Sequence, residues 1–113
     1  MINKNLFDIE SSIFMGAKRN PHNCSVGIFG VNYDGTCSYK SGARFGPNAI
    51  RQVSTCLETF CPKLEKDLED INYVDFGSLE IDNNDSKSVI ASVKSATNYL
   101  MSKSRTPIIL GGE

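Results

Sequence analysis

Apolar and polar positions alternate in blocks along this chain, and three of the apolar blocks have the length and composition of β-strands. Residues 24–31 are almost all apolar, residues 71–76 are expected to form a second strand, and residues 108–110 form a third that Pro107 opens. A near-continuous apolar run such as residues 24–31 is typical of a strand that is covered on both faces. The second strand is expected to end at Gly77-Ser78.

Two stretches between these strands have the spacing of helices. Pro47 fits the first position of a helix, because that position does not use the amide hydrogen that proline lacks. It is followed by one apolar stripe over about three turns, made of Ala49, Ile50, Val53 and Leu57. A longer helix is predicted over residues 86–103, after a turn rich in capping residues. Its buried face is expected to hold Val89, Ile90, Val93, Ala96 and Leu100, with Lys87, Lys94 and Asn98 pointing outward.

The remaining segments are more polar. Residues 1–23 are treated as an N-terminal extension. Its apolar cluster predicts a short helix or a segment that packs across a neighbour, and consists of Leu6, Phe7, Ile9, Ile13, Phe14 and Met15. Residues 58–69 are mixed and broken by Pro62, which indicates an extended excursion. The order strand, helix, strand, helix, strand over residues 24–113 predicts an open α/β sheet of parallel strands joined by right-handed crossovers, and the chain ends at a strand tip.

Candidate chemistry gathers where the predicted strands end. In open α/β sheets, ligands bind outside the carboxyl ends of the strands. The loop 32–46, the Gly77-Ser78 turn and the final Gly-Gly-Glu113 should converge on that edge. Asp34 and Arg44 lie in this loop. They would either contact a ligand or hold the loop in one shape, through an internal ion pair or through bonds from the carboxylate to the backbone. The three glycines of the loop favour this structural role.

Composition and charge exclude several classes of function. The net charge is −1 and no basic stripe is present, which gives no reason to expect nucleic acid or an anionic membrane as a partner. No apolar run approaches the ~20 residues of a membrane span. The N-terminus has no secretory signal, so a cytoplasmic protein is expected.

Motifs for other chemistries are also missing. The four cysteines, Cys24, Cys37, Cys56 and Cys61, form no Cys-x-x-Cys pair, and the chain has one histidine, so a zinc site is not expected. Reduced, structural thiols fit a cytosolic chain. The histidine, His22, lies in a turn before the first strand, which indicates an exposed side chain rather than a ligand. No glycine-rich phosphate-binding motif follows the first strand.

One segment carries a family signature. It begins at residues 30–36, Gly-Val-Asn-Tyr-Asp-Gly-Thr, and continues through residues 38–51, which include Gly-Ala-Arg-Phe-Gly-Pro. This segment resembles the N-terminal signature of the ureohydrolase (arginase/agmatinase) family, and of agmatinases most closely. Further matches follow at residues 54–62, 67–70 and 74–77. Residues 107–113 look like the strand that ends at the first metal-binding histidine of the family, so the resemblance covers about residues 26–113.

The resemblance implies a three-layer α/β/α sandwich with a mainly parallel sheet, of which the N-terminal βαβαβ portion is present. It implies hydrolysis of a guanidino substrate at a binuclear Mn²⁺ centre, with agmatine giving urea and putrescine in polyamine biosynthesis, and a homo-oligomer. The metal ligands of the family lie C-terminal to Glu113. Residues 1–113 are therefore expected to hold no catalytic residue and no metal ligand, and to be inactive alone.

The resemblance also implies roles for particular residues. It places Asp34, Tyr39, Arg44 and Phe45 on a loop at the edge of the active site. Glu113 becomes the candidate for orienting a metal ligand without contacting the metal.

The chain also departs from the family pattern. Asn32 replaces a common proline, Lys40-Ser41 replace an Arg-Pro pair, and Ser78 stands where an aspartate is frequent. All three departures concern the shape of the loop and the choice of substrate. Because Ser78 has no carboxylate, no side chain at this position of the chain can fill the role of that aspartate.

Two functions of different classes follow. In the first, the chain is the N-terminal part of an agmatinase-like hydrolase within a longer polypeptide. In the second, it is a natural truncation, a non-catalytic module that binds partners or associates with intact subunits. The sequence favours the first because it stops in the middle of a motif, at a strand tip.

Overall fold

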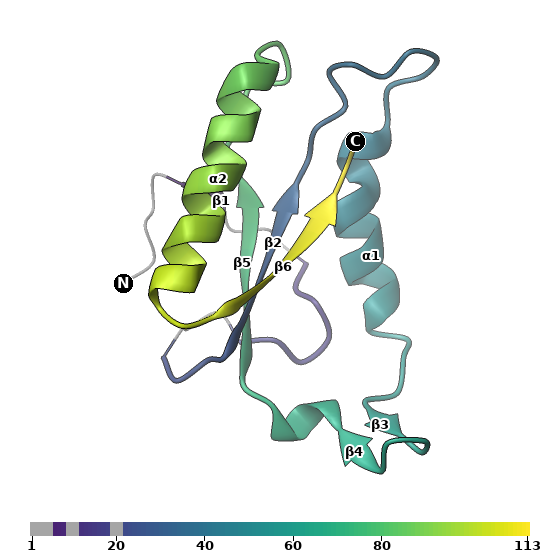
Figure 1. Ribbon diagram of the computed structural model, residues 1–113. Coiled ribbons are helices and arrows are strands. Elements are labelled where there is room, and N and C mark those ends of the chain that lie inside the picture. The colour runs from purple at the N-terminus through teal and green to yellow at the C-terminus, as the bar shows by residue number, and fades with distance from the viewer. Residues whose placement is uncertain (1–5, 9–11, 19–21) are drawn as a thin grey trace.

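The computed structural model describes residues 6–8, 12–18 and 22–113 as a mostly parallel sheet with a helix on each face (Figure 1). The sheet has four strands in the order β1-β5-β2-β6. Its strands are β1 (Phe7–Asp8), β2 (Val26–Val31), β5 (Tyr73–Leu79) and β6 (Thr106–Gly111). β2 runs parallel to both β5 and β6, and β1 is antiparallel to β5. The predicted α/β class is confirmed.

Two helices connect the parallel strands, α1 (Gly46–Ser54) and α2 (Ser86–Ser102). A short 3-10 helix, η1 (Ala43–Phe45), immediately precedes α1. Three short elements lie between α1 and β5: β3 (Phe60–Cys61), β4 (Lys66–Asp67) and η2 (Leu68–Asp70). β3 and β4 pair as a small antiparallel ribbon, in the segment where an extended excursion was expected. Neither helix, nor any other within the described ranges, is both long and apolar enough to span a bilayer.

The main hydrophobic core lies between α2 and the sheet. Phe29 of β2 and Phe76 of β5 are almost inaccessible, and they meet Ala96 and Leu100 of α2, which are fully buried. Asp85 caps the N-terminus of α2, and its carboxylate accepts a hydrogen bond from the Ser88 amide at 3.1 Å. The predicted limits of this helix are confirmed to within one residue.

One residue of the predicted α2 face is not buried. Val89, Ala96 and Leu100 face the sheet as expected, but the side chain of Ile90 is 69% exposed. Ile90 lies one position beyond Val89, so the helix turns its side chain away from the part of the sheet that is present. Lys87, Lys94 and Asn98 are exposed, as the pattern predicted.

The opposite face of the sheet is covered by α1, and two of the three buried side chains of this helix are polar. Pro47, Arg51 and Ser54 are the buried residues of this helix. Val53 is 62% and Leu57 63% exposed, which shows that the apolar stripe predicted for the same segment does not face the sheet. A buried ionic network, described below, occupies the place that the stripe would have filled.

The second parallel strand is longer than the sequence indicated. Gly77-Ser78 does not end it, and β5 continues to Leu79. Gly77 adopts φ +89°, which lets the strand bend while it stays in the sheet, and the register between β2 and β5 shifts at the same level. Ser78 and Leu79 remain part of β5 because they pair with β1.

The N-terminal segment packs onto the sheet. Phe7 of β1 stacks on Phe76 with ring centroids 5.1 Å apart, and Phe14 meets Tyr73 edge-on at 6.4 Å. The hydroxyl of Tyr73 donates to the Met15 carbonyl. Of the apolar cluster noted in the sequence, Ile9 lies outside the described residues. The other members form a strand and a packed segment rather than a helix, and the division at residue 23 remains a prediction.

Candidate functional site

The carboxyl ends of β2 and β6 meet the loop 32–46, as the sequence predicted (Figure 1). The amide of Glu113 donates to the Tyr33 carbonyl at 2.8 Å, which ties the end of the chain to the start of the loop. The end of the loop is equally close, since a methyl group on Gly46 would lie 3.0 Å from the carbonyl oxygen of Gly111. This edge of the sheet is the ordinary place for ligands in such folds.

Asp34 is the centre of the loop. Its side chain is fully buried, and it forms an ion pair with Arg44, whose side chain is 42% exposed, with Nη2 to Oδ1 at 2.6 Å. Nε of Arg44 lies 2.9 Å from both carboxylate oxygens. The Gly42 amide donates to Oδ2 at 2.7 Å. The carboxylate therefore closes the loop from residue 34 to residue 44, as the internal ion pair considered in the sequence analysis would.

These contacts fix the charge of the carboxyl group. The Arg44 side chain is the main cause that lowers the pKa of Asp34 from 3.8 to about 2, against the opposing effect of burial, and the Gly42 and Arg44 amides add to the lowering. Asp34 in turn raises the pKa of Arg44. Both groups are ionised at neutral pH, and both carboxylate oxygens already have donors. The Asp34 carboxylate therefore does not take up a proton at neutral pH.

The loop is also anchored to the segment that follows β5. The Asp34 amide donates to Oδ1 of Asn83 at 2.9 Å, and Nδ2 of Asn83 donates to the Asn32 carbonyl at 3.3 Å. Gly35 has no room for a side chain, because a methyl group there would overlap the Asn83 carbonyl. Connections after β2, β5 and β6 therefore meet at one edge. The part of the β5 connection that reaches it is Asn83, and not the Gly77-Ser78 turn that the sequence suggested.

Glu113 holds the other side of the loop. Its carboxylate accepts hydrogen bonds from the Thr36 amide at 3.1 Å, from the Thr36 hydroxyl, and from the Cys37 thiol at 3.7 Å. Burial is the main cause that raises the pKa of Cys37, and the Glu113 carboxylate adds to it. The thiol therefore stays protonated at neutral pH and acts as a hydrogen-bond donor rather than a nucleophile.

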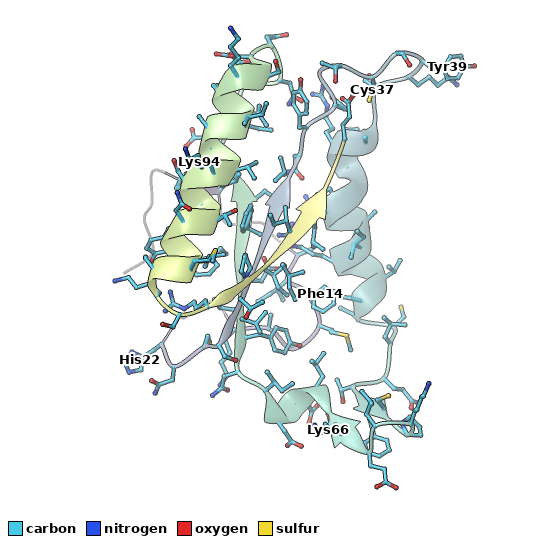
Figure 2. The ribbon with its side chains drawn as sticks, in the orientation of Figure 1. Phe14, His22, Cys37, Tyr39, Lys66 and Lys94 are labelled. Carbon is cyan, nitrogen blue, oxygen red and sulfur yellow. The ribbon has the colours of Figure 1, made fainter. Side chains whose placement is uncertain are left out.

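Two further residues assigned to this loop by resemblance lie on its surface. Tyr39 is 90% and Phe45 69% exposed. Figure 2 shows Tyr39 at the outer tip of the loop, directed away from the sheet. A role of Asp34, Tyr39, Arg44 and Phe45 at the edge of an active site stays a prediction.

A buried network beneath this edge was not predicted. Arg51 of α1 forms an ion pair with Asp75 of β5, with Nε to Oδ2 at 2.8 Å and Nη2 to Oδ1 at 3.0 Å. Both side chains are almost inaccessible to solvent. Nη2 also donates to the Gly77 carbonyl at 2.8 Å, and Nη1 donates to the Ser78 hydroxyl at 3.3 Å. Ser78, the position where the family often has an aspartate, is thus a structural partner of Arg51.

The same network secures the N-terminal segment. The Phe14 amide donates to Oδ2 of Asp75 at 2.9 Å, and the Met15 amide donates to the Ser54 hydroxyl at 3.0 Å. The sequence carried one signal of this arrangement. Asp75 is a charged residue within an otherwise apolar strand, and such a residue needs a buried partner.

The single histidine lies away from the edge. His22 precedes β2 and lies at the opposite end of the strands from Cys37 (Figure 2). None of Cys24, Cys37, Cys56 and Cys61 is in a disulfide, and the Cys24 thiol donates to the His22 carbonyl at 3.7 Å. In residues 6–8, 12–18 and 22–113, no three His, Cys, Asp or Glu side chains come together so as to hold a metal ion.

Comparison with known proteins shows what this arrangement is similar to. The model of the Arginase family matches residues 24–113. The agmatinase of Halalkalibacterium halodurans is 33% identical over 101 residues, which are 89% of this chain and 35% of that protein. The N(1)-aminopropylagmatine ureohydrolase of Thermococcus kodakarensis is 35% identical over 88 residues, 76% of this chain and 31% of that protein. The chain therefore spans about a third of the length of these curated relatives.

Solved structures show the same partial correspondence. The agmatine ureohydrolase of Thermoplasma volcanium superposes with a TM-score of 0.84 at 30% identity, over 93% of this chain and 36% of that one. A formiminoglutamase of Trypanosoma cruzi, solved with Mn²⁺, superposes with a TM-score of 0.72 at 21% identity, over 88% of this chain and 34% of that one. The second likeness concerns the fold alone. Together they confirm the α/β sandwich expected from the sequence.

Proposed function

This chain belongs to the arginase family, and from that premise we propose that it is the N-terminal portion of an agmatinase-like hydrolase. The complete protein would cleave a guanidino substrate, with agmatine giving urea and putrescine. The observation that carries this proposal is the family match over residues 24–113, which includes the whole loop at the carboxyl edge of the sheet. The names of the two curated relatives, an agmatinase and an N(1)-aminopropylagmatine ureohydrolase, support this substrate class.

The loop would contribute shape to such an active site. The Asp34 carboxylate accepts hydrogen bonds from the Arg44 side chain and from two backbone amides. The Glu113 carboxylate accepts hydrogen bonds from Thr36 and Cys37. Both carboxylates already accept several hydrogen bonds from the loop, so their proposed role is to hold the loop against the tip of β6. A rigid loop keeps a substrate in one orientation, which is a large part of what an active site contributes to the rate.

The residues described do not fit a manganese pair. Such a centre needs on the order of six ligands, mostly carboxylates and imidazoles. The described ranges contain no cluster of even three such side chains, and the whole sequence has one histidine. The proposed Mn²⁺ ligands therefore belong to polypeptide other than residues 1–113. Support for manganese comes from the family and from the Mn²⁺-containing neighbour of the same fold.

A non-catalytic module is the second candidate function. It is favoured by the same lack of a metal-binding cluster in the described residues, and by large apolar side chains that are exposed on β6 and α1. A module of this kind would act by association, either with a partner or with intact subunits. In both cases we propose a cytoplasmic protein that forms homo-oligomers, and the catalytic version would act in polyamine biosynthesis.

The coding sequence downstream of Glu113 separates the two candidates. A histidine codon, followed by Asp-x-His-x-Asp and later aspartate pairs, would support the hydrolase, and a stop codon would support the module. If the reading frame continues, metal content and urea release should be measured for residues 1–113 and for the extended protein in parallel. We expect stoichiometric manganese and urea release from agmatine only in the extended protein, with activity abolished by a chelator.

The substrate is tested in the same assay by comparing agmatine with N(1)-aminopropylagmatine. Faster turnover of agmatine would support the specific proposal, and a preference for the larger compound would correct the substrate within the same class. Stoichiometric manganese in residues 1–113 would contradict the placement of the ligands. An extended protein that binds manganese but hydrolyses neither compound would contradict the proposed activity.

A further inference from the structure

The guanidinium of Arg51 uses every one of its donor hydrogens, although the side chain is inaccessible to solvent. Nε and Nη2 donate to the two carboxylate oxygens of Asp75, at 2.8 and 3.0 Å. Nη2 also donates to the Gly77 carbonyl at 2.8 Å. Nη1 donates to the Ser78 hydroxyl at 3.3 Å and to Oδ1 of Asn48 at 2.9 Å. Because a guanidinium is a rigid planar fork, one group fixes the positions of all these acceptors.

The acceptors around Arg51 belong to two different elements. Asn48 lies in the first turn of α1, directly after the loop ends, whereas the other three acceptors belong to β5. β2 packs closely against both. A methyl group on Gly30 of β2 would lie 2.6 Å from the Ser78 hydroxyl and 2.9 Å from Cβ of Pro47. Arg51 therefore joins α1 to β5 at a tightly packed point beneath the carboxyl edge of the sheet.

The loop above this point is attached to the same two elements. The Asp34 amide donates to Oδ1 of Asn83, in the connection that follows β5. Arg44 belongs to η1, which is continuous with α1. The ion pair of Arg44 with Asp34 thus spans, close to the surface, the same two elements that Arg51 and Asp75 join in the interior. A shift of α1 relative to β5 would therefore move Arg44 relative to Asp34.

We propose that Arg51 is a positioning residue for the active site: it holds the first turn of α1 against β5 and so keeps the loop 32–46 in the shape that orients the substrate. The inference rests on the proposed function, because the substrate is that of the agmatinase-like hydrolase. Arg51 is fully buried, so it acts through the loop and not by touching a substrate. A displacement of about 1 Å that originates far from the chemistry can lower a rate on the order of a hundredfold.

A purely stabilising role for Arg51 is the alternative. Stability alone is a weak reason for a buried ion pair, since apolar residues of similar volume often stabilise a core equally well. The arrangement also goes beyond a charge pair, because Arg51 donates to Asn48 on α1 as well as to Asp75 on β5. Lysine carries the same charge on a compact ammonium and lacks the planar fork. Arg51→Lys therefore separates the charge of the side chain from its geometry.

Steady-state kinetics of the protein at its natural length test the proposal, with agmatine and N(1)-aminopropylagmatine as substrates. At a temperature where the variant is folded, Arg51→Lys should lower kcat/KM by about tenfold or more. Leu100→Ala is the control, because Leu100 is a fully buried core residue and its truncation is strongly destabilising. Leu100 packs near the start of β2, since a methyl group on Gly27 would lie 2.7 Å from it. Leu100→Ala should lower the melting temperature but leave kcat and KM unchanged.

Hydrogen exchange of the loop gives a second measurement that requires no substrate. The Asp34 amide is bonded to Asn83, and the Gly42 amide is bonded to the Asp34 carboxylate. Both amides should exchange about tenfold faster or more in Arg51→Lys, through local opening of the loop, and at the wild-type rate in Leu100→Ala.

Two milder variants decide the question if Arg51→Lys does not fold. Asn48→Ala removes one acceptor of Arg51 on α1, and Ser78→Ala removes one on β5. Each should accelerate exchange of the loop amides and lower kcat/KM, with smaller effects than Arg51→Lys, because the other hydrogen bonds of the guanidinium remain.

Three results would overturn the proposal. The first is equal changes of kcat/KM in Arg51→Lys and Leu100→Ala. The second is wild-type exchange of the loop amides in all the folded variants of Arg51, Asn48 and Ser78. The third is faster exchange of these amides with kcat and KM unchanged, which would show that the shape of the loop does not matter for the reaction.

These results are distinct from a failure of the proposed function. A wild-type protein that releases no urea from either compound counts against the activity, and hydrogen exchange then decides whether Arg51 holds the loop. Urea release at the wild-type rate by Arg51→Lys, together with unchanged exchange of the loop, supports the activity and counts against the positioning role.

Discussion

Nη2 of Arg44 lies 2.6 Å from Oδ1 of Asp34, and this ion pair joins the two ends of the loop that leaves β2. The pKa of Asp34 is lowered to about 2, so the folded state of the protein favours the ionised form of this carboxylate. The stabilising effect is therefore complete above the ordinary pKa of 3.8 and is lost as the pH falls from there to about 2. Urea unfolding of the wild-type chain and Asp34→Asn should differ most above pH 4 and converge by about pH 2.

The pKa itself can be measured by NMR titration of the Asp34 carboxyl carbon. Arg44→Lys keeps the positive charge but loses the planar fork, so it should raise the pKa of Asp34 towards 3.8. Lys40→Ala is the control, because it removes a positive charge from the exposed tip of the same loop. An Asp34 pKa that is unchanged in Arg44→Lys would show that the backbone amides, rather than the guanidinium, are the main cause.

A second prediction concerns the buried pair beneath the loop. Arg51→Met leaves the carboxylate of Asp75 buried without its cation, and removal of one partner of such a pair costs about 3–5 kcal/mol. The double variant Arg51→Met/Asp75→Asn removes both charges and should recover more than half of that loss. Urea unfolding measures both, with Lys87→Met as the control, since Lys87 is exposed on α2. A double variant less stable than Arg51→Met would contradict this account.

The parallel core of the fold could be predicted because a local pattern in the sequence indicates each strand. The run that ends at Val31 and the run that ends at Leu110 are apolar at successive positions, and α2 has a capping residue, Asp85, at its start. What the sequence could not show is which face of α1 meets the sheet. The apolar stripe suggested Val53, whereas the ion pair of Arg51 with Asp75 determined the outcome.

The candidate site was predictable in position but not in detail. Its location follows from the general rule for open α/β sheets, and the Asp34–Arg44 pair was one of two interpretations of the loop. The contact of Glu113 with Thr36 spans 77 positions of the sequence, so no local pattern could reveal it. Asn83 lies in the turn before the predicted helix 86–103, and its contact with Asp34 depends on how the β5 connection meets the loop.

A third prediction uses Cys37 as a reporter of Glu113. Burial and the Glu113 carboxylate raise the pKa of Cys37, so a smaller fraction of the thiol is ionised at any given pH. Glu113→Gln removes the negative charge and keeps an acceptor for Thr36. The pKa of Cys37 should fall and its alkylation by iodoacetamide near pH 8 should accelerate. Mass spectrometry resolves the rate at each cysteine, and Cys56, which is exposed, is the internal control.

The adjacent glycines at the tip of β6 allow a matched test of how tightly the loop is held. A methyl group on Gly112 would lie 2.5 Å from the carbonyl oxygens of both Val31 and Tyr33, and backbone atoms cannot move aside as a flexible side chain would. A methyl group on Gly111 would meet nothing within 4 Å. Gly112→Ala should therefore cost about 1–3 kcal/mol, as overpacking of a filled site does.

In a domain of this size, each kcal/mol lowers the melting temperature by about 4–8 °C. Gly111→Ala should change stability by no more than about 0.5 kcal/mol, as surface substitutions do. Because the clash falls on Tyr33, the hydrogen bond from the Glu113 amide should also weaken in Gly112→Ala, and this amide should exchange with solvent faster than in Gly111→Ala. Equal melting temperatures and equal exchange rates in the two variants would show that the tip of β6 is not held against the loop as the structure indicates.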